Sequence, residues 1–415
     1  MEQLPIEIMA PAGNRDAMMA GIKAGANSIY FGVEQLNMRA RQTNNFTLED
    51  LSEVAEICRG NGVKSYITLN TIIYDHDTSL VRRIIDKAKE VGITAVIAAD
   101  LAVMRYCKKQ GMELHVSTQC NITNIESVEF FSDYADVMVL ARELSLKQVK
   151  DITTAIEKEQ IKGPSGNLVQ IEIFAHGALC MAVSGKCYLS LHSYNASANR
   201  GACLQNCRRT YQVTDKEDGT EFEIDNEYIM SAKDLCTIDF IDKILDAGVR
   251  VLKIEGRGRA ADYVYTTTKC YSEAVQAIKD GQYTEEKIED WRSRLSSVYN
   301  RGFWDGYYLG RKMGEWSNRY GSVATEKKVY LGKGIKYFDK IGVGQFLIES
   351  QELNVGDKLI ITGPTTGYVE TVAEEIRLET GETALRAARG DSISLKIPEK
   401  IRPSDKLYKV VSANV

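Results

Sequence analysis

The sequence is 415 residues long, with 44% hydrophobic and 26% charged residues and a formal net charge of −5. This composition is typical of a globular protein, and the net charge argues against a protein that coats itself in nucleic acid, although a local basic surface remains compatible with binding one. No stretch approaches the ~20 apolar residues of a membrane span, and Met1–Pro5 lacks the basic and apolar regions of a secretory signal, so we expect a cytoplasmic protein with no membrane partner.

Eight short apolar segments alternate with helix-period segments from the start of the chain. The predicted strands are Ile6–Met9, Ser28–Phe31, Ser65–Leu69, Ala95–Ala98, Leu114–Ser117, Val137–Leu140, Ile171–Phe174 and Val251–Ile254. The predicted helices between and after them include Asn14–Lys23, Leu48–Arg59, Ser79–Glu90, Ser145–Glu157 and Asp262–Lys279. Eight such units predict an α/β fold of the TIM (β/α)8 barrel type, whose active sites lie at the carboxyl ends of the strands.

One connection is too long for a single crossover helix. The seventh strand ends near Ala175, whereas the eighth begins at Val251. Part of the excess, Tyr211–Ile229 with Asp218-Gly219 at its centre, predicts a β-hairpin. We therefore expect an insertion of about residues 177–236 on the functional face of the barrel.

The last quarter of the chain has a different pattern of predicted elements. A helix is predicted at Glu285–Tyr299, followed by an arginine- and aromatic-rich link, Arg301–Tyr320. From Gly321 onward six strands are predicted: Gly332–Tyr337, Gln345–Ile348, Asp357–Ile361, Gly367–Val372, Ile393–Ile397 and Lys406–Val410. Short, turn-punctuated strands predict a small β-barrel. We expect domains at residues 1–320 and 321–415.

Two segments of this second domain, "LNVGDKLIITG" and "ARGDSISLKI", resemble the second domain of translational GTPases. That module is often found on proteins that contact tRNA or ribosomes. The resemblance implies that residues 321–415 recruit RNA.

Nine cysteines in a cytoplasmic chain are expected to be reduced. Five of them fall in the insertion, with the spacings C-x6-C and C-x3-C and then a lone cysteine: Cys180, Cys187, Cys203, Cys207 and Cys236. Grouped cytosolic cysteines predict a metal site. The loose spacing favours an iron–sulfur cluster on four thiolates, while structural zinc stays an alternative. Cys58, Cys107 and Cys270 lie in helical segments and are expected to be buried.

The segment "EIFAHGALCMAVSGKCYLS" at Glu172–Ser190 resembles the signature of the collagenase-like peptidase family U32. Further matching motifs cover nearly the whole barrel: "APAGN", "IYFG", "NMRAR", "TLNT", "ARELSL", "NRGACLQNCR", "SAKDLC" and "LKIEGRGR".

The resemblance implies a 4Fe-4S cluster and hydroxylation without dioxygen. One branch of the family acts on a ubiquinone precursor, one on a ribosomal RNA cytidine and one on the wobble uridine of tRNA. The RNA branches use prephenate as the hydroxyl source. The implied ligands are Cys180, Cys187, Cys236 and one of Cys203 or Cys207, with Cys203 favoured. Because the chain carries both a barrel and a small β domain, it most resembles the tRNA branch.

A dicarboxylate such as prephenate calls for cationic side chains, and guanidinium suits it best because it binds carboxylate bidentately. Arg142 and Arg257 end strands six and eight, at the functional face of the predicted barrel. Arg39 and Arg41, after strand two, and Lys253 are the next candidates for substrate binding.

Two residues of strand seven are further candidates for catalysis. Glu172 would orient a neighbouring polar group if its side chain points inward, and His176 would donate a hydrogen bond to cluster or substrate. Cations interleaved with aromatic side chains favour RNA binding. The candidates are Arg200, Arg208, Arg209 and Arg259 with Tyr188 and Tyr194.

Two alternatives remain open. A Cys–His peptidase would be assembled from Cys180 and His176, although the insertion gathers five thiols where a nucleophile needs only one. The second is a non-enzymatic RNA-binding adaptor whose metal site is structural.

Overall fold

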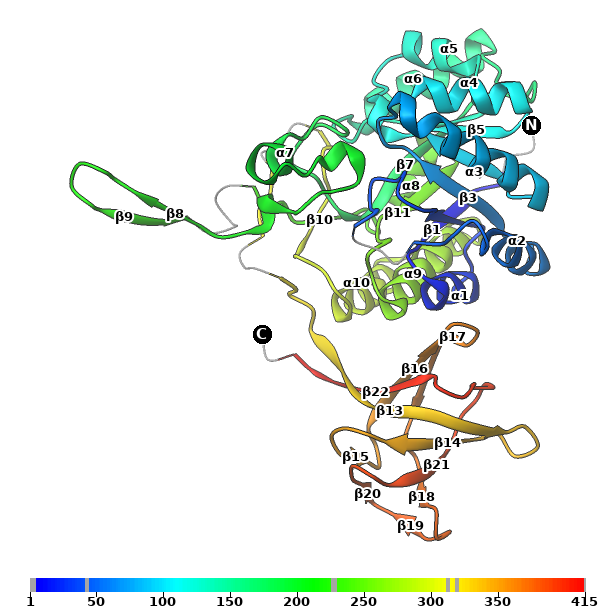
Figure 1. Ribbon diagram of the computed structural model, residues 1–415, viewed down its shortest axis with the longest axis vertical. Helices are drawn as coiled ribbons and strands as arrows, with labels where there is room; N and C mark the ends of the chain where they lie inside the picture. The colour runs from blue at the N-terminus through cyan, green and yellow to red at the C-terminus, as the bar shows by residue number, and fades with distance from the viewer. Residues whose placement is uncertain (1–4, 42–44, 225–229, 311–313, 318–320, 414–415) are drawn as a thin grey trace.

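The computed structural model describes residues 5–41, 45–224, 230–310, 314–317 and 321–413. Eight parallel strands form a closed barrel because β11 pairs with both β1 and β7 (Figure 1). The barrel strands are β1 Glu7–Ala12, β2 Ser28–Gly32, β3 Lys64–Leu69, β4 Ala95–Ala98, β5 Glu113–Val116, β6 Val137–Val139, β7 Gln170–Ala178 and β11 Val251–Ile254. The predicted TIM barrel is confirmed, with every expected strand in place.

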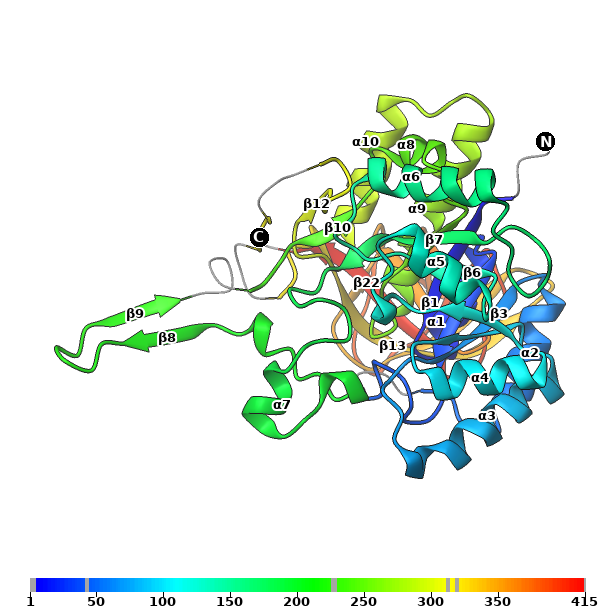
Figure 2. The ribbon, with the colours of Figure 1, turned by 90° about the horizontal axis from the view of Figure 1, so that it is seen from above.

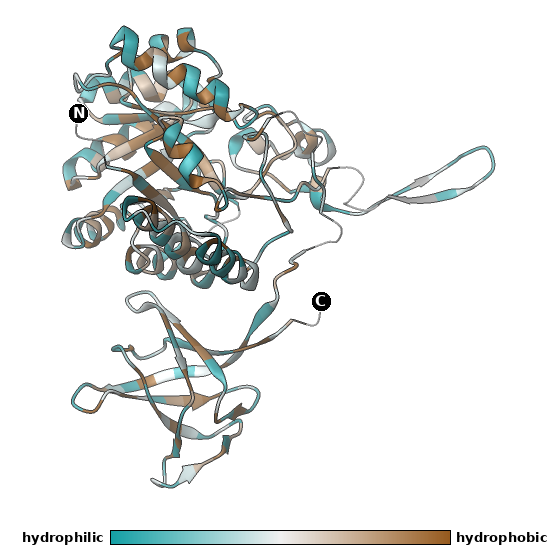
Figure 3. Ribbon diagram, turned by 180° about the vertical axis from the view of Figure 1, so that it is seen from behind, coloured by the Kyte–Doolittle hydropathy of each residue, from teal (hydrophilic) through white to brown (hydrophobic). Residues whose placement is uncertain are grey.

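Helices surround the barrel, and hydrophobic strands lie inside this ring (Figure 3). They are α1 Arg15–Lys23, α2 Leu51–Gly60, α3 Thr78–Val91, α4 Leu101–Gln110, α5 Ile125–Ser132, α6 Leu146–Glu159, α8 Ile241–Asp246, α9 Ala261–Lys279 and α10 Glu285–Ser297, with 3-10 turns at Asp75–Asp77 and Thr118–Cys120. Asn14 and Ser145 cap α1 and α6 by accepting from backbone N–H groups of the first turn. Across the described parts of the chain, no helix is long and apolar enough to cross a membrane.

The insertion lies beside the carboxyl end of the barrel. It contains α7 (Leu189–Tyr194) and short 3-10 turns at Ala198–Arg200 and Asn206–Arg208. Its strands β8 (Tyr211–Thr214) and β9 (Glu221–Ile224) form a hairpin that projects away from the barrel in both views (Figures 1 and 2). The predicted hairpin is confirmed, although residues 225–229 of the prediction lie outside the described residues.

The insertion returns to the barrel through β10 (Asp234–Cys236), which pairs antiparallel with β7. This register sets Cys236 opposite His176. The two-residue strand β12 (Phe303–Trp304), from the link after α10, pairs with the other edge of β10.

The C-terminal strands surround a hydrophobic core of their own, which includes Leu331, Phe346, Ile361 and Leu395. Their main sheet contains β13 Glu326–Phe338, β14 Val343–Ile348, β16 Lys358–Gly363, β17 Gly367–Val372, β18 Ile376–Leu378, β19 Thr383–Ala384, β21 Ser392–Lys396 and β22 Lys406–Ser412, and a small second sheet pairs β15 Leu353–Asn354 with β20 Arg386–Ala387. The six predicted strands are present. The short strands β15, β18, β19 and β20 were not predicted, because two or three residues carry too little alternation to be recognised.

The C-terminal strands pack on α1 and α9 of the barrel (Figure 1). Ala20, Ala261, Ile360 and Tyr368 form a buried cluster there. Tyr368 stacks on Tyr265 with ring centroids 4.3 Å apart. The interface is therefore tight and partly aromatic.

Candidate active site at the mouth of the barrel

A cavity of about 480 Å³ lies at the carboxyl ends of the barrel strands, bordered on one side by the insertion. This is the face on which TIM barrels build their active sites. Among the described residues that line the cavity, Glu255 is the one carboxylate, whereas seven side chains are cationic: Arg39, Arg142, Arg208, Lys253, Arg257, Arg259 and Arg301. The cavity is thus built to hold a negatively charged ligand.

Four of the five insertion cysteines line this cavity: Cys180, Cys187, Cys203 and Cys207. Cys180 is exposed and the other three are half-buried. Burial raises the pKa of Cys187 and of Cys207, and in both cases the neighbouring Cys180 and Cys203 act in the same direction. The four thiols are therefore close enough to influence one another's charge.

Cys236 is not among them. Its side chain is 4% exposed and belongs to the hydrophobic core of the barrel. The Tyr271 hydroxyl lies 3.9 Å from its sulfur, and burial raises the pKa of Cys236 to about 12. The sequence-based ligand set, Cys180, Cys187, Cys236 and Cys203, is thus not what the structure brings together, because strand β10 directs Cys236 to the far side of β7 and leaves Cys207 at the cavity.

The donor set fits an iron–sulfur cluster in number and in chemistry. Four thiol ligands around one space match the four thiolates of a 4Fe-4S cube, and soft sulfur donors suit iron and zinc alike. Within the described residues, no three Cys, His, Asp or Glu side chains converge on a point that would hold one metal ion. The four thiols line one cavity.

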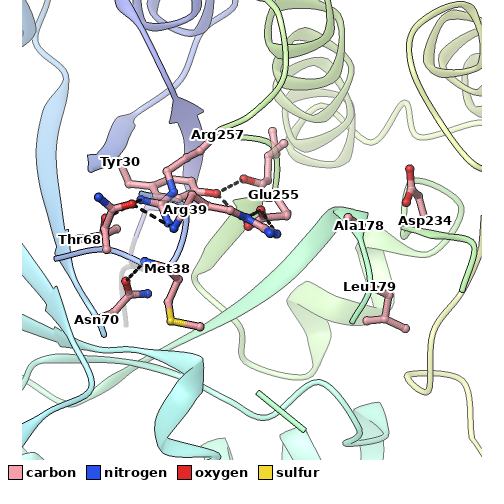
Figure 4. A network of polar contacts seen from close by, with 12 residues as sticks. Tyr30, Met38, Arg39, Thr68, Asn70, Ala178, Leu179, Asp234, Glu255 and Arg257 are labelled. Carbon is pink, nitrogen blue, oxygen red and sulfur yellow. Dashed lines mark hydrogen bonds and ion pairs between the residues drawn. The ribbon is translucent and has the colours of Figure 1, made fainter. Parts of the chain in front are cut away.

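The cavity floor contains an ion pair between Arg39 and Glu255, whose atoms Nη2 and Oε1 lie 2.9 Å apart (Figure 4). Burial acts to raise the pKa of Glu255, but Arg39, Arg142 and Arg257 together lower it to about 2. The pKa of Arg39 is raised, first by Glu255 and less by the thiols of Cys203 and Cys180. Arg39 therefore interacts electrostatically with both the acid and the cysteines.

Arg257 and Arg142 each retain unused hydrogen-bonding capacity. Arg257, 5% exposed, donates to Asn37 Oδ1 at 3.0 Å and to Thr68 Oγ1 at 2.7 Å. Arg142 donates to the Ala178 carbonyl at 3.1 Å, with its guanidinium carbon 3.9 Å from the centroid of the Phe174 ring. The Nε atoms of both arginines are buried without a hydrogen-bond partner among the described residues. Both arginines line the cavity, where their positive charges favour an anionic ligand.

Lys253 and Glu172 form a second ion pair below the floor, with Nζ and Oε1 2.7 Å apart. Lys253 lines the cavity, whereas Glu172 is fully buried in the barrel interior. Behind it, His115 Nδ1 lies 3.8 Å from Glu172 Oε2. Glu172 therefore points inward, as the hypothesis of an orienting carboxylate requires, but its partner is Lys253 and it does not itself line the cavity.

His176 lies on the other side of strand β7. It is 1% exposed, and its Nδ1 is 3.3 Å from the Tyr271 hydroxyl. Burial lowers its pKa to about 3, so the ring is neutral at physiological pH. His176 is not among the described cavity-lining residues, so the structure does not place it where the expected catalytic role requires.

The remaining candidates are divided between the cavity and its surroundings. Arg208 lines the cavity and donates to the carbonyls of Leu179 and Ala232. Arg200 is held outside the lining by an ion pair with Asp77, and Arg41 is exposed. Arg209 is also outside it and donates to the Tyr194 hydroxyl at 2.8 Å.

Several functional residues were missed from the sequence. Tyr30 and Glu255 lie within motifs that carry the family resemblance, so motif membership could have identified them. Tyr299 ends the predicted helix Glu285–Tyr299 and Arg301 begins the link after it, and no motif marks either as a site residue. Arg301 is fixed by Asp234 at 3.1 Å, and both side chains are buried.

Comparison with known proteins identifies a family match and several relatives. A family model described as peptidase family U32 matches residues 13–318. The chain is 59% identical to a protein named collagenase from Porphyromonas gingivalis over 97% of both chains. It is 36% identical to 23S rRNA 5-hydroxycytidine C2501 synthase of Escherichia coli over 66% of this chain and 40% of that protein. It is 26% identical to tRNA hydroxylation protein P of Escherichia coli over 94% of this chain and 93% of that protein.

Proposed function

The chain belongs to peptidase family U32, and we propose that it is an iron–sulfur-dependent, oxygen-independent hydroxylase of RNA that acts on the wobble uridine of tRNA. The observation that carries this proposal is the cavity itself. Four cysteines and seven cationic side chains surround a space with one carboxylate, at the face of the barrel where catalysis occurs.

In this proposal Cys180, Cys187, Cys203 and Cys207 hold a 4Fe-4S cluster. When bound, such a cluster supplies one-electron redox chemistry. The surrounding protein contributes Arg39 and Arg208, whose positive charges stabilise the thiolate form of the adjacent cysteines.

The floor of the cavity holds the hydroxyl source, for which prephenate is the proposed molecule. Its two carboxylates meet Arg142 and Arg257, both of which line the cavity. Its ring lies against Tyr30 and Phe174, two lining residues whose ring centroids lie 4.6 and 5.6 Å from Lys253 Nζ. Glu255 remains ionised and holds Arg39 away from these carboxylates, so the binding charge is supplied by the other cations.

Two features support tRNA as the RNA. The similarity to tRNA hydroxylation protein P of Escherichia coli extends over 94% of this chain and so includes the C-terminal strands. Tyr188 and Tyr194 are exposed on the insertion, where Arg209 packs on the Tyr194 ring, and they suit an RNA surface. Residues 321–415 are proposed to recruit the RNA.

A peptidase remains the second candidate because the relative named collagenase is 59% identical over nearly the whole chain. Its assembly from Cys180 and His176 is opposed by the structure of the described residues. His176 is buried against Tyr271 and forms no hydrogen bond with Cys180 among the described residues, and its lowered pKa makes it a poor base.

Nucleoside mass spectrometry of a host lacking the gene tests the proposal. We expect one oxygen-bearing modification to disappear from the wobble uridine of a tRNA subset, while ribosomal RNA nucleosides and collagen cleavage stay unchanged. If a modification disappeared from ribosomal RNA only, the substrate would be ribosomal RNA and not tRNA. Unchanged RNA with collagen cleavage abolished by Cys180→Ala would establish the peptidase instead.

A further inference from the structure

We propose that Arg259 and Tyr299, stacked at the edge of the cavity, form the site that receives the RNA base to be modified; this rests on the proposed function of the same cavity. The guanidinium carbon of Arg259 lies 3.5 Å from the centroid of the Tyr299 ring. Arg259 follows strand β11, whereas Tyr299 comes from the segment between α10 and β12. Two distant parts of the chain thus build one flat, cationic surface.

Arg259 differs from the other cations of the cavity in its partners. Arg39 is paired with Glu255, Lys253 with Glu172 and Arg301 with Asp234. The side-chain N–H groups of Arg259, by contrast, have neither a hydrogen bond nor an ion pair among the described residues. Its guanidinium packs on the Tyr299 ring and, at 5.9 Å, on that of Tyr263, which leaves these donors for a ligand.

The stack shares its cavity with the cysteines. The Arg301 guanidinium carbon lies 5.2 Å from the Tyr299 ring, and Arg259, Tyr299 and Arg301 line the same cavity as Cys207. A planar group placed against Arg259 at this edge would therefore enter the cavity that the thiols line.

Exposure distinguishes this edge from the floor. Arg259 and Tyr299 are half-exposed, whereas Arg257 on the floor is 5% exposed. A buried floor suits a small acid that enters whole, while a half-exposed edge can receive a base that stays attached to a macromolecule. Bases in RNA loops are unstacked and bind on aromatic rings and on guanidinium planes. The chemistry of the edge matches a nucleobase.

Binding of two synthetic anticodon stem-loops to the anaerobically purified full-length protein tests the proposal. One stem-loop carries uridine at the wobble position and the other an abasic ribose there. We expect the wild type to prefer the uridine RNA by about tenfold, the scale of stacking one base. Arg259→Ala should abolish this preference, and so should Arg259→Lys, because lysine keeps the charge but lacks the planar group.

Arg209→Ala is the matched control, since Arg209 also packs on a tyrosine, Tyr194, but does not line the cavity. This substitution should lower the affinity for both RNAs equally. Tyr299→Phe should retain the preference and Tyr299→Ala should lose it. A preference that survives in the Arg259 variants, or equal binding of both RNAs by the wild type, would overturn the base site while leaving RNA binding intact. Failure of the wild type to bind either RNA would overturn the proposed function, and the base site with it.

Discussion

The guanidinium of Arg39 lies 2.9 Å from the carboxylate of Glu255, the one acid among the described residues that line the cavity. The pair connects the floor of the barrel to the cysteines, because Arg39 interacts electrostatically with Cys203 and Cys180 as well as with Glu255.

Glu255→Gln should destabilise the protein by on the order of 3 kcal/mol at pH 7, because it leaves the guanidinium of Arg39 without its counter-charge. The folded-state pKa of Glu255, about 2, is below that of an unfolded glutamate. Its stabilisation is therefore complete above the unfolded pKa near ~4.3 and is lost as the pH falls toward 2. Urea unfolding should show a difference between wild type and variant that shrinks over this window. As a control, Glu90→Gln removes an exposed ion pair with Lys87 and should lower the free energy of unfolding by less than about 1 kcal/mol.

Replacing Cys180, Cys187, Cys203 or Cys207 by Ala should each lower the iron and sulfide content of anaerobically purified protein and abolish its visible absorption, because a cube loses one of four ligands. Cys236→Ala should retain both, since its thiol lies in the hydrophobic core. If Cys236→Ala lost the iron and Cys207→Ala kept it, the ligand set expected from the sequence would be right. Stoichiometric zinc in place of iron would refute the cluster.

Arg142→Ala should keep the iron content of the wild type but weaken prephenate binding by about 2–4 kcal/mol, the scale for removing a charged hydrogen-bond partner. Isothermal titration calorimetry measures this directly. Arg41→Ala provides the control, because Arg41 is exposed and outside the described lining of the cavity. Equal prephenate affinities of Arg142→Ala and the wild type would show that this guanidinium does not bind prephenate.

His115 should give the protein a component of stability that is lost at alkaline pH. Burial acts to lower its pKa, but Glu113 and Glu172 raise it to about 9. Because the folded pKa exceeds the unfolded value of ~6.5, the contribution is complete below pH 6.5 and is lost as the pH rises through 9. Its size is on the order of 2–3 kcal/mol. His115→Gln should be less stable at pH 6 yet show a flatter decline between pH 6.5 and 9, and an identical decline would contradict the assignment.

A chain ending at Tyr320 should fold and retain its iron, because the barrel and the C-terminal strands have separate cores. It should bind tRNA more weakly. It should also lose solubility, since truncation exposes the surface of α1 and α9 that Tyr368 and its neighbours cover. Gel filtration and tRNA affinity measure these effects. Undiminished tRNA affinity would show that residues 321–415 do not recruit RNA.

The sequence by itself determined the barrel, because each strand is a short apolar run flanked by helix-period segments, a pattern that depends only on neighbouring residues. It also placed five cysteines in one insertion after strand β7. Which four of them meet was decided by tertiary structure. Antiparallel pairing of β10 with β7 sets Cys236 opposite His176, and both side chains contact Tyr271. Since alternate residues of a strand face opposite sides, a shift of one residue in this register would reverse the outcome. The sequence could not predict the stack of Arg259 on Tyr299 for the same reason. The proximity of these two residues depends on how α9 and α10 fold back against the barrel.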